Sequence, residues 1–418
     1  MKYINIFYNK KDLNICILEK GSEIGFHIVS GNCFDTRALD ELFPNWKNKE
    51  EIPVTQKVYS DELYFYSKYN QIKIPNMFLP KKYKNYENYI ISLGQLCKWL
   101  ASEAEELGVD ILVGFAGSEI LYCQENGYVK GVATNDFGIS KDGTFKETYQ
   151  RGMQINAPFT ILSEGARGSL SEQVIDKFNL RKNCGVPTYG LGFKEVWEFD
   201  PEIIKQIGPG RVIHTLGYPM DYSTYGGGFL YTMESGLAQV GYIIGLDYKN
   251  PHMNLYQEFQ LWKSHPHIKM LLEKGRCINY GARVINQGGY DTIPELAFPG
   301  GALIGCSAGF VDILKIKGTH NAMKTGMLAA EQIIQEIINK GGIQFIENGT
   351  KLSNLQEQYQ QSWVGQELKK ARYVKQNFKQ SFFKGITSAM FSMFGLSGIT
   401  KKSPNQINDS EIMDNINK

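Results

Sequence analysis

The sequence predicts an α/β fold that carries an inserted, mostly antiparallel β domain. The first observation is a helix–turn–strand unit, in which apolar residues recur at three- and four-residue steps over 93–107 and Gly108 precedes the apolar run 109–113. The second is a stretch at 186–250 that is rich in aromatic and β-branched residues between glycines. The third is a late strand at 302–304 that runs through a small-residue turn into a long helix.

The composition is that of a packed globular protein rather than of a disordered or nucleic-acid-binding chain. The 418 residues suffice for two or three domains of roughly 100–200 residues each. They are 42% hydrophobic and 21% charged, and the formal net charge of +2 provides no basic field for nucleic acid. No apolar run approaches the roughly 18 residues that a membrane-spanning helix needs.

The 7 cysteines are dispersed along the chain, and no two of them lie within four positions of each other. The sequence therefore has no CxxC pair and no short zinc or iron–sulfur spacing. An odd, scattered set in a large chain is typical of reduced thiols and predicts an intracellular or organellar compartment.

The first predicted strand, NICIL at 14–18, ends on Glu19. In a dinucleotide-binding domain, a carboxylate after the second strand accepts hydrogen bonds from ribose hydroxyls. A surface glutamate after a strand is the plainer interpretation of this motif alone. Such a domain opens with a GxGxxG turn, yet the residues before Asn14 contain no glycine. We therefore expect the chain to begin inside that unit.

Two hairpins and a buried strand are predicted next. Asn126-Gly127 and Asp142-Gly143 each separate two strand-like runs, and both dipeptides favour the primed turns of tight hairpins. The run FTIL at 159–162 then leads into SEGARG at 163–168, which predicts a buried strand followed by a turn.

Two glycine-rich segments are candidate ligand sites, because glycine lets a backbone approach a ligand closely. Gly226–Gly228 stands between Tyr225 and Phe229, so it could meet a flat apolar ligand or could mark a bent strand. PGGALIGCSAG at 299–309 could aim amide groups and a helix N-terminus at a ring or phosphate, or could serve tight strand–helix packing.

Four further features leave their roles open. Cys306 adjoins no base, so we interpret it as a small buried residue rather than as a nucleophile. His320, near the start of the last long helix, could be a general acid, a cofactor contact or a structural residue. Ser30-Gly31 could donate to a cofactor ring. The run IPNMFLP at 74–80, followed by lysines, fits the edge of an anionic bilayer or a plain surface loop.

Taken in order, these motifs resemble the electron transfer flavoprotein–ubiquinone oxidoreductase family. The matching words run over about 11–375 and include ICILEKGSEIGFHIVSGNCFD, TYGGGFLY, INYGARVINQGGY and FPGGALIGCSAGF. The resemblance implies a glutathione-reductase-like FAD-binding domain, discontinuous in sequence, with an inserted ubiquinone-binding domain. It also implies electron transfer from reduced electron transfer flavoprotein through FAD and a 4Fe-4S iron–sulfur cluster to ubiquinone, in peripheral contact with the matrix side of the inner mitochondrial membrane.

The resemblance also implies binding residues by position, and it requires no acid–base dyad because the cofactor carries the redox chemistry. Ubiquinone contacts are implied at Gly226 and Gly227, and no metal ligand is implied. FAD contacts are implied at Glu19, Ser30, Gly31, Glu164, Gly165, Gly305, Cys306, Gly309, Gly318 and Thr319.

The implied domain organisation has four parts. They are an incomplete FAD-binding domain at 1–185 with a candidate membrane-surface loop at 70–90, a ubiquinone-binding β-rich domain at 186–290, the last FAD-binding strand and helix at 291–345, and C-terminal helices with a disordered tail at 346–418. Relative to the family the chain looks truncated at both ends. No cysteine follows Cys306, so we expect this chain not to ligate the cluster.

Two other functions stay open at this point. The chain could be a split or cofactor-poor relative that acts as a structural or interaction subunit. It could instead be another FAD-dependent reductase or hydroxylase, because such enzymes share words of the EGARGS and GCSAGF types. They are not expected to share TYGGGFLY and INYGARVINQGGY, which favours the first resemblance.

Overall fold

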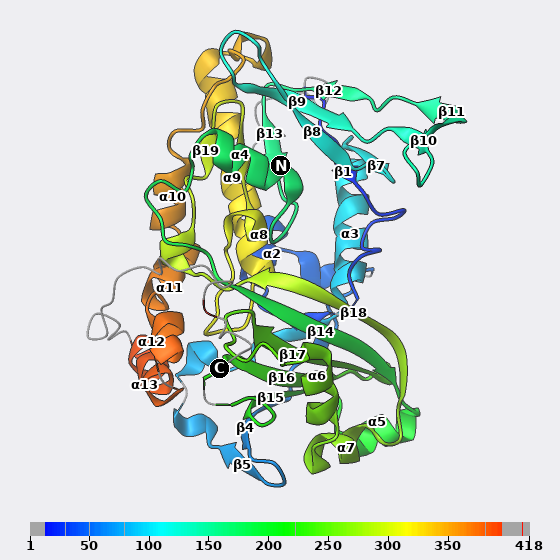
Figure 1. Ribbon diagram of the computed structural model, residues 1–418, viewed down its shortest axis with the longest axis vertical. Helices are drawn as coiled ribbons and strands as arrows, with labels where there is room; N and C mark the ends of the chain where they lie inside the picture. Colours follow the sequence, from blue (N-terminus) through cyan, green and yellow to red (C-terminus); the bar gives the residue numbers. More distant parts are fainter. Residues whose placement is uncertain are drawn as a thin grey trace.

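The computed structural model describes residues 13–29, 31–49, 51–78, 80–221, 223–380, 382–394 and 412. Two halves lie one above the other in Figure 1, a mixed α/β half and a half built on one large sheet. The tail that the sequence predicts to be disordered, 401–418, lies outside the described residues except for Ile412.

The large sheet has seven strands in the order β18-β14-β17-β16-β15-β4-β5. Every neighbouring pair is antiparallel except β15 and β4, which run parallel. The mostly antiparallel second region is thereby confirmed. The strands are β4 (Ser60–Tyr66), β5 (Gln71–Ile74), β14 (Tyr189–Glu198), β15 (Arg211–Gly217), β16 (Gly226–Thr232), β17 (Leu237–Gly245) and β18 (Arg276–Asn286).

Strands β4 and β5 come from a part of the chain that the sequence analysis assigned to the first FAD-binding segment. They join the sheet because β4 pairs with β15 in register from Ser60 opposite Arg211 to Tyr66 opposite Gly217. The large sheet is therefore built from two separate stretches of sequence, 60–74 and 189–286.

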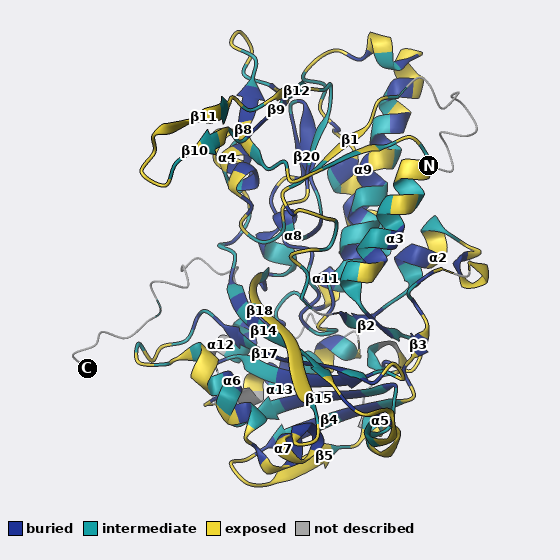
Figure 2. Ribbon diagram, turned by 90° about the vertical axis from the view of Figure 1, so that its right-hand side faces the viewer, coloured by how far each residue is buried: buried dark blue, intermediate teal, exposed yellow. Residues whose placement is uncertain are grey.

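One face of the large sheet is covered by its own helices. Trp262 and Phe259 of α6 (Leu255–Lys263) and Ile268 of α7 (Pro266–Leu272) are buried with Leu230 and Tyr242 of the sheet. α5 (Pro201–Ile207) adds Ile204 to the same core. Figure 2 shows the central strands buried and β18 exposed at the edge. The face of the sheet that these helices do not cover is turned toward the α/β half.

The α/β half contains parallel strand pairs, as a dinucleotide-binding domain does. β1 (Cys16–Glu19) runs parallel to β7 (Asp110–Val113), and β13 (Thr160–Leu162) runs parallel to β20 (Gly301–Leu303). The predicted helix is α3 (Leu93–Glu106), with Gly108 in the left-handed region just after its end. The late strand is followed by α8 (Gly305–Ala308) and α9 (Thr319–Lys340).

Both predicted hairpins form. Asn126-Gly127 joins β8 (Gly117–Tyr122) to β9 (Val129–Thr134), and Asp142-Gly143 joins β10 (Phe137–Ile139) to β11 (Phe145–Gln150). The second hairpin projects from the α/β half in Figure 1.

The remaining elements cover these two halves. They are β2 (Asn32–Phe34), β3 (Gln56–Lys57), β6 (Tyr89–Ile91), β12 (Gln154–Asn156), β19 (Ala297–Phe298), α2 (Arg37–Leu42), α4 (Ser169–Lys177), α10 (Leu355–Gln361), α11 (Trp363–Lys370), α12 (Val374–Gln380), α13 (Phe382–Met393), and the short 3-10 turns Trp46–Asn48, Asn76–Phe78, Lys81–Tyr83, Tyr290–Thr292 and Ile343–Phe345. α9 is the longest helix and packs against α2, α8 and α10.

Candidate functional site

A cavity of about 1150 Å³ lies between the two halves. On one side it is lined by β1, α3, α8 and the segment 311–319, and on the other by the open face of the large sheet. Pockets that hold small ligands typically measure about 300–1,000 Å³, so this cavity has room for an extended ligand. Its two walls come from regions that are far apart in the sequence.

The sheet register shows which side chains face the cavity. His214 of β15 lies opposite Phe229 of β16, and Phe229 lies opposite Gly241 of β17. Gly241 in turn lies opposite Lys194 of β14. Because cross-strand partners share a face, these four residues form one row, and His214, Phe229 and Lys194 line the cavity.

Both residues of the predicted glycine pair line the cavity, in different ways. A Cβ at Gly227 would lie 2.5 Å from the carbonyl oxygen of Thr215, and a Cβ at Gly226 would lie 2.9 Å from that of Ile243. Neither position has room for a side chain. With glycine at both positions, the backbone itself forms this part of the cavity wall, as close approach of a flat ligand would require.

Glu19, the acidic residue that ends β1, is part of the wall of the same cavity. Glu19 lines it, and one carboxylate oxygen accepts a hydrogen bond from the backbone N–H of Gly21 at 2.6 Å. That bond fixes the carboxylate and leaves its second oxygen available to a ligand. Ser30 lies outside the described residues, whereas Gly31 lines the cavity.

Asn32 and Thr319 connect two cavity walls, and the sequence analysis did not single out Asn32. The Asn32 Nδ2 donates to the Thr319 Oγ1 at 2.6 Å, which joins β2 to the first turn of α9. The Asn32 Oδ1 is buried and has no partner among the described residues. Gly318 also lines the cavity beside Thr319, so the N-terminal end of α9 borders the ligand space.

The segment after β13, which contains Glu164 and Gly165, lines the cavity and also stabilises the start of α4. Glu164 accepts hydrogen bonds from the backbone N–H and the hydroxyl of Ser171, both at 2.7 Å, and so caps the first turn of α4. Gly165 lines the cavity with a φ of +85°, in the region that favours glycine.

The turn after β20 contributes Gly305 and Cys306 to the cavity wall. Burial raises the pKa of the Cys306 thiol to about 11, which agrees with the interpretation of a small buried residue rather than a nucleophile. Gly309, by contrast, does not reach the lining formed by the described residues. Its φ of +94° ends α8, and a Cβ there would lie 2.9 Å from the Asn286 Nδ2.

A cluster of polar groups borders the cavity near β4. Asn85 donates from its backbone N–H and its amide to Asp61 at 2.8 and 2.9 Å, and its amide oxygen accepts from the Lys317 Nζ at 2.6 Å. His214 and Tyr231 form a second pair, with 2.8 Å between the Nε2 and the hydroxyl oxygen. Burial lowers the pKa of His214 to about 4, with help from the nearby charge of Lys317.

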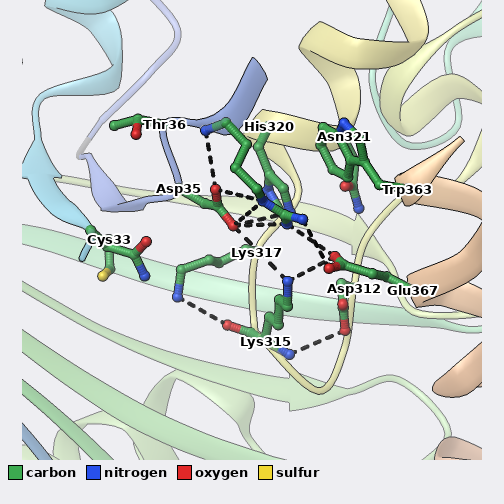
Figure 3. A network of polar contacts seen from close by, with 12 residues as sticks. Cys33, Asp35, Thr36, Asp312, Lys315, Lys317, His320, Asn321, Trp363 and Glu367 are labelled. Carbon is green, nitrogen blue, oxygen red and sulfur yellow. Dashed lines mark hydrogen bonds and ion pairs between the residues drawn. The ribbon is translucent and has the colours of Figure 1, made fainter. Parts of the chain in front are cut away.

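His320 lies in a separate, buried network that Figure 3 shows from close by. It is 1% exposed, its ring stacks on Trp363 at 5.6 Å, and its Nε2 lies 3.9 Å from an Asp35 carboxylate oxygen. Burial lowers the pKa of His320 to about 3. Of the roles left open above, the structural one fits this placement, because His320 does not line the cavity.

The charges around His320 are paired across three elements. Arg37 donates to both oxygens of Glu367 at 2.9 and 3.0 Å and also to Asp35, while the Lys315 Nζ lies 2.7 Å from Glu367. Burial acts to raise the pKa of Asp35, but the hydrogen bonds and charge of Arg37, with His320, lower it to about 2. This network ties α11 to the loop before α9 and to the end of β2.

Within the described ranges, no group of three or more His, Cys, Asp or Glu side chains is placed to hold a metal ion. None of the described helices is both long and apolar enough to cross a bilayer. The lining of the cavity combines many apolar side chains, such as Leu96, Leu216 and Ile304, with glycines and a few charged groups.

Solved structures with the same architecture are flavoproteins and reductase-like proteins. A geranylgeranyl bacteriochlorophyll reductase-like protein from Thermoplasma acidophilum superimposes with a TM-score of 0.61 at 19% identity, over 96% of this chain and 87% of its own. A flavoprotein/dehydrogenase from Cytophaga hutchinsonii superimposes with a TM-score of 0.57 at 16% identity, over 93% and 89%. The fold is therefore that of the FAD-dependent oxidoreductases, as the sequence predicted.

Sequence comparison finds more similar proteins within this class of flavoproteins. Residues 189–285 match the family model described as ETF-QO, ubiquinone-binding. The chain is 45% identical over 397 residues to the mitochondrial electron transfer flavoprotein-ubiquinone oxidoreductase of Dictyostelium discoideum, and 45% identical over 395 residues to that of Oryza sativa subsp. japonica. The alignments cover 93% and 94% of this chain and 64% and 65% of those relatives. The resemblance to the electron transfer flavoprotein–ubiquinone oxidoreductase family is thereby confirmed, and the chain spans slightly less than two thirds of the length of these relatives.

Proposed function

We propose that this chain transfers electrons from reduced electron transfer flavoprotein to ubiquinone through FAD. The observation that carries the proposal is that Glu19 and Gly227 open into one cavity. Glu19 ends the dinucleotide-type strand, and Gly227 lies in the segment that matches the ubiquinone-binding model. A cofactor on the first wall and a quinone on the second would therefore share one cavity.

The residues on the α/β side fit FAD. The Asn32 Oδ1 is a buried acceptor that has no partner among the described residues, and the start of α9 at Thr319 offers backbone N–H groups with the positive end of the helix dipole. We propose that Glu19 holds the ribose, and that Gly31, Gly165, Gly305 and the 318–319 turn contact the rest of FAD. When bound, FAD supplies the redox chemistry, and the protein binds, orients and shields it.

The open face of the sheet fits a flat quinone ring. The wall at Gly226 and Gly227 carries no side chain of its own at these two residues, and Leu216, Leu63 and Ile243 add apolar surface to the same lining. We propose that this wall binds the ubiquinone head group. An aromatic or quinone ring can lie against such a surface while its oxygens reach backbone amides.

We further propose that one end of the molecule contacts the inner mitochondrial membrane from its matrix side. Ile72 of β5 is 67% exposed, Met77 just after it is 81% exposed, and Phe394 at the end of α13 is 61% exposed. Both β5 and α13 lie in the lower half of Figure 1. Exposed apolar side chains in the company of lysines at 81–84 suit the boundary between headgroups and acyl chains.

For the iron–sulfur cluster that the resemblance implies, we propose ligands other than the cysteines of this sequence. The 7 cysteines are free thiols, and their spacing suits no cluster. Electrons would therefore reach the FAD of this chain from outside it, either directly from electron transfer flavoprotein or by way of a cluster held elsewhere.

The first experiment measures the visible absorbance spectrum of the purified 418-residue chain, with released flavin quantified against protein. We expect close to one FAD per chain, and reduction of ubiquinone-1 when reduced electron transfer flavoprotein is added. A folded chain that stays free of flavin at saturating FAD would overturn the proposal and favour a cofactor-poor subunit. A flavin-loaded chain that reduces other acceptors but not ubiquinone-1 would favour a different FAD-dependent reductase.

A further inference from the structure

Lys194 occupies a position on the large sheet whose four adjacent positions on the same face carry no ionisable side chain. Its cross-strand partners are Gly241 on β17 and Gly281 on β18. The residues two places away on β14, which share its face, are Gly192 and Val196. The four nearest positions on this face therefore offer neither a counter-charge nor a hydrogen-bonding side chain.

The Lys194 side chain lines the cavity and makes no hydrogen bond or ion pair with the residues that the structure describes. Other buried lysines differ in this respect. Lys263, on the opposite side of the sheet, lies 2.7 Å from Glu195, and Lys315 lies 2.7 Å from Glu367. Lys375 lies 3.2 Å from Asp247.

The other cations of the cavity wall are either engaged or exposed. Arg283 donates to the backbone carbonyl of His27 at 3.0 and 3.3 Å, and Lys317 donates to Asn85. Lys20 lines the cavity rim and is exposed to solvent. Among the described residues of the lining, Lys194 is therefore the partly buried cation that stays available to pair with a bound ligand.

An unpaired buried charge is costly, and an opposite charge in the ligand is what offsets the cost. Burial lowers the pKa of Lys194 to about 8, so the ammonium group is still largely protonated at pH 7. The Phe229 ring lies over Gly241 and the Val29 side chain lies over Gly281, so apolar groups flank Lys194 on both neighbouring strands.

We propose that Lys194 donates a charged hydrogen bond to a conjugated carbonyl of the redox ring that binds in this cavity, and so stabilises the negative charge that the ring gains on reduction. The inference rests on the proposed function, which supplies both the ring and its electrons. Two rings carry this chemistry, the flavin with its pyrimidine carbonyls and the quinone head group. The experiment below separates them.

The first measurement is competitive acetylation of the full-length chain with acetic anhydride, read residue by residue by mass spectrometry. Lys274, which is exposed on the far side of the sheet's helices, is the internal reference. We expect saturating FAD or ubiquinone-1 to slow the acetylation of Lys194 at least tenfold relative to Lys274. Protection by FAD identifies the flavin as the partner, and protection by ubiquinone-1 identifies the quinone. Protection by neither overturns the proposal.

The second measurement separates a charge contact from simple coverage. If the flavin is the partner, Lys194→Met should lower the affinity for reduced relative to oxidised FAD about tenfold, which equals a midpoint potential about 30 mV lower for a two-electron couple. If the quinone is the partner, the same variant should raise the KM for ubiquinone-1 about tenfold at unchanged flavin content. Lys194→Arg should recover most of either loss, and Lys274→Met should change neither. An unaltered potential and KM in Lys194→Met would refute the charge contact.

The acetylation and midpoint-potential readouts are independent of turnover with electron transfer flavoprotein. A chain in which ligand protects Lys194 but which fails to reduce ubiquinone-1 would contradict the proposed function and leave the Lys194 contact standing. A chain that reduces ubiquinone-1 while Lys194 stays unprotected would support the proposed function and contradict the Lys194 contact.

Discussion

The Asn32 amide donates to the Thr319 hydroxyl at 2.6 Å and joins residues that are 287 positions apart. One lies on the strand that follows the dinucleotide-type loop, and the other lies on the first turn of the longest helix. The bond therefore holds two walls of the cavity together at the point where FAD is proposed to bind.

Removal of this bond should weaken cofactor binding more than it weakens the fold. We expect Asn32→Ala to lower the affinity for FAD about 5- to 30-fold, because a buried hydrogen bond and its unsatisfied partner are worth about 1–2 kcal/mol. Thr319→Ala should give a similar loss. The double variant should lose less than the sum, since the two residues are partners. Fluorescence titration with FAD measures all three, and fully additive losses would show that the two residues act separately.

Gly227→Val should impair quinone reduction more than flavin content. A Cβ at this position would already lie 2.5 Å from the Thr215 carbonyl oxygen, and the larger side chain would enter the cavity at the proposed quinone wall. Gly226→Val should act in the same direction. Gly192→Ala is the matched control on the same sheet, because its Cβ would meet Ile243 Cγ1 at an ordinary 3.5 Å. Loss of flavin instead of quinone reduction in Gly227→Val would show that the pair serves folding or FAD.

Stability should fall as the pH is lowered below neutrality. Burial lowers the pKa of His320 from 6.5 to about 3 and that of His267 from 6.5 to about 4, so the unfolded chain binds more protons than the folded chain between those values. The stabilisation is complete above pH 6.5 and is lost on acidification, by about 1.4 kcal/mol per pH unit for each histidine.

Urea unfolding between pH 7.5 and pH 4.5 measures this slope. His320→Phe keeps a ring against Trp363 and should make the pH dependence shallower by about one proton. His252→Gln, which alters an exposed histidine, should leave the slope unchanged. A slope in His320→Phe that equals that of the parent chain would contradict the burial of a neutral imidazole.

Cysteine labelling should divide the thiols by exposure. Cys16 and Cys277 are exposed, whereas burial raises the pKa of Cys306 to about 11. With iodoacetamide at pH 7.5 we expect Cys16 and Cys277 to be modified and Cys306 to resist until the chain is unfolded. Cys306→Ala should retain FAD. Rapid modification of Cys306 in the folded chain would argue for a reactive thiol in the site.

Membrane contact should depend on the apolar side chains near β5. Met77→Asp is expected to weaken binding to vesicles of cardiolipin and phosphatidylcholine at least tenfold, because a buried methionine contributes about 1.5–3 kcal/mol. Met153→Asp is the control, since Met153 is 46% exposed and lies in the α/β half. Equal binding of the two variants in a co-sedimentation assay would place the contact elsewhere.

The sequence predicted best those elements whose signals are local. The helix at 93–106, the strand at 110–113 and both hairpins follow from apolar periodicity, from Gly108 and from Asn-Gly and Asp-Gly turns, all of which act within a few residues. The pairing of β4 with β15 escaped prediction because it joins Ser60 to Arg211, and no local pattern encodes such a register.

The residues of the candidate site also differ in how far local sequence patterns could predict them. Glu19 and the glycines could be proposed from the sequence because their motifs are short and continuous, and of these glycines Gly309 does not reach the described lining. Asn32 could not be proposed in this way, because its contact with Thr319 forms only when β2 packs against α9. Lys194 sits in a strand whose alternation predicts one buried face, and a lysine on that face was an available signal. Its lack of a partner depends on glycines of two other strands, so only the assembled sheet reveals it.

The parallel pairing of β4 with β15 affects how far the two walls of the cavity can move relative to each other. Residues 60–74 form β4 and β5 of the large sheet, whereas β3 before them and β6 after them pair with each other outside it. The chain therefore crosses into the large sheet and back again at this point. A change in the distance between the two walls of the cavity has to bend both crossings, which restricts how far the cavity can open.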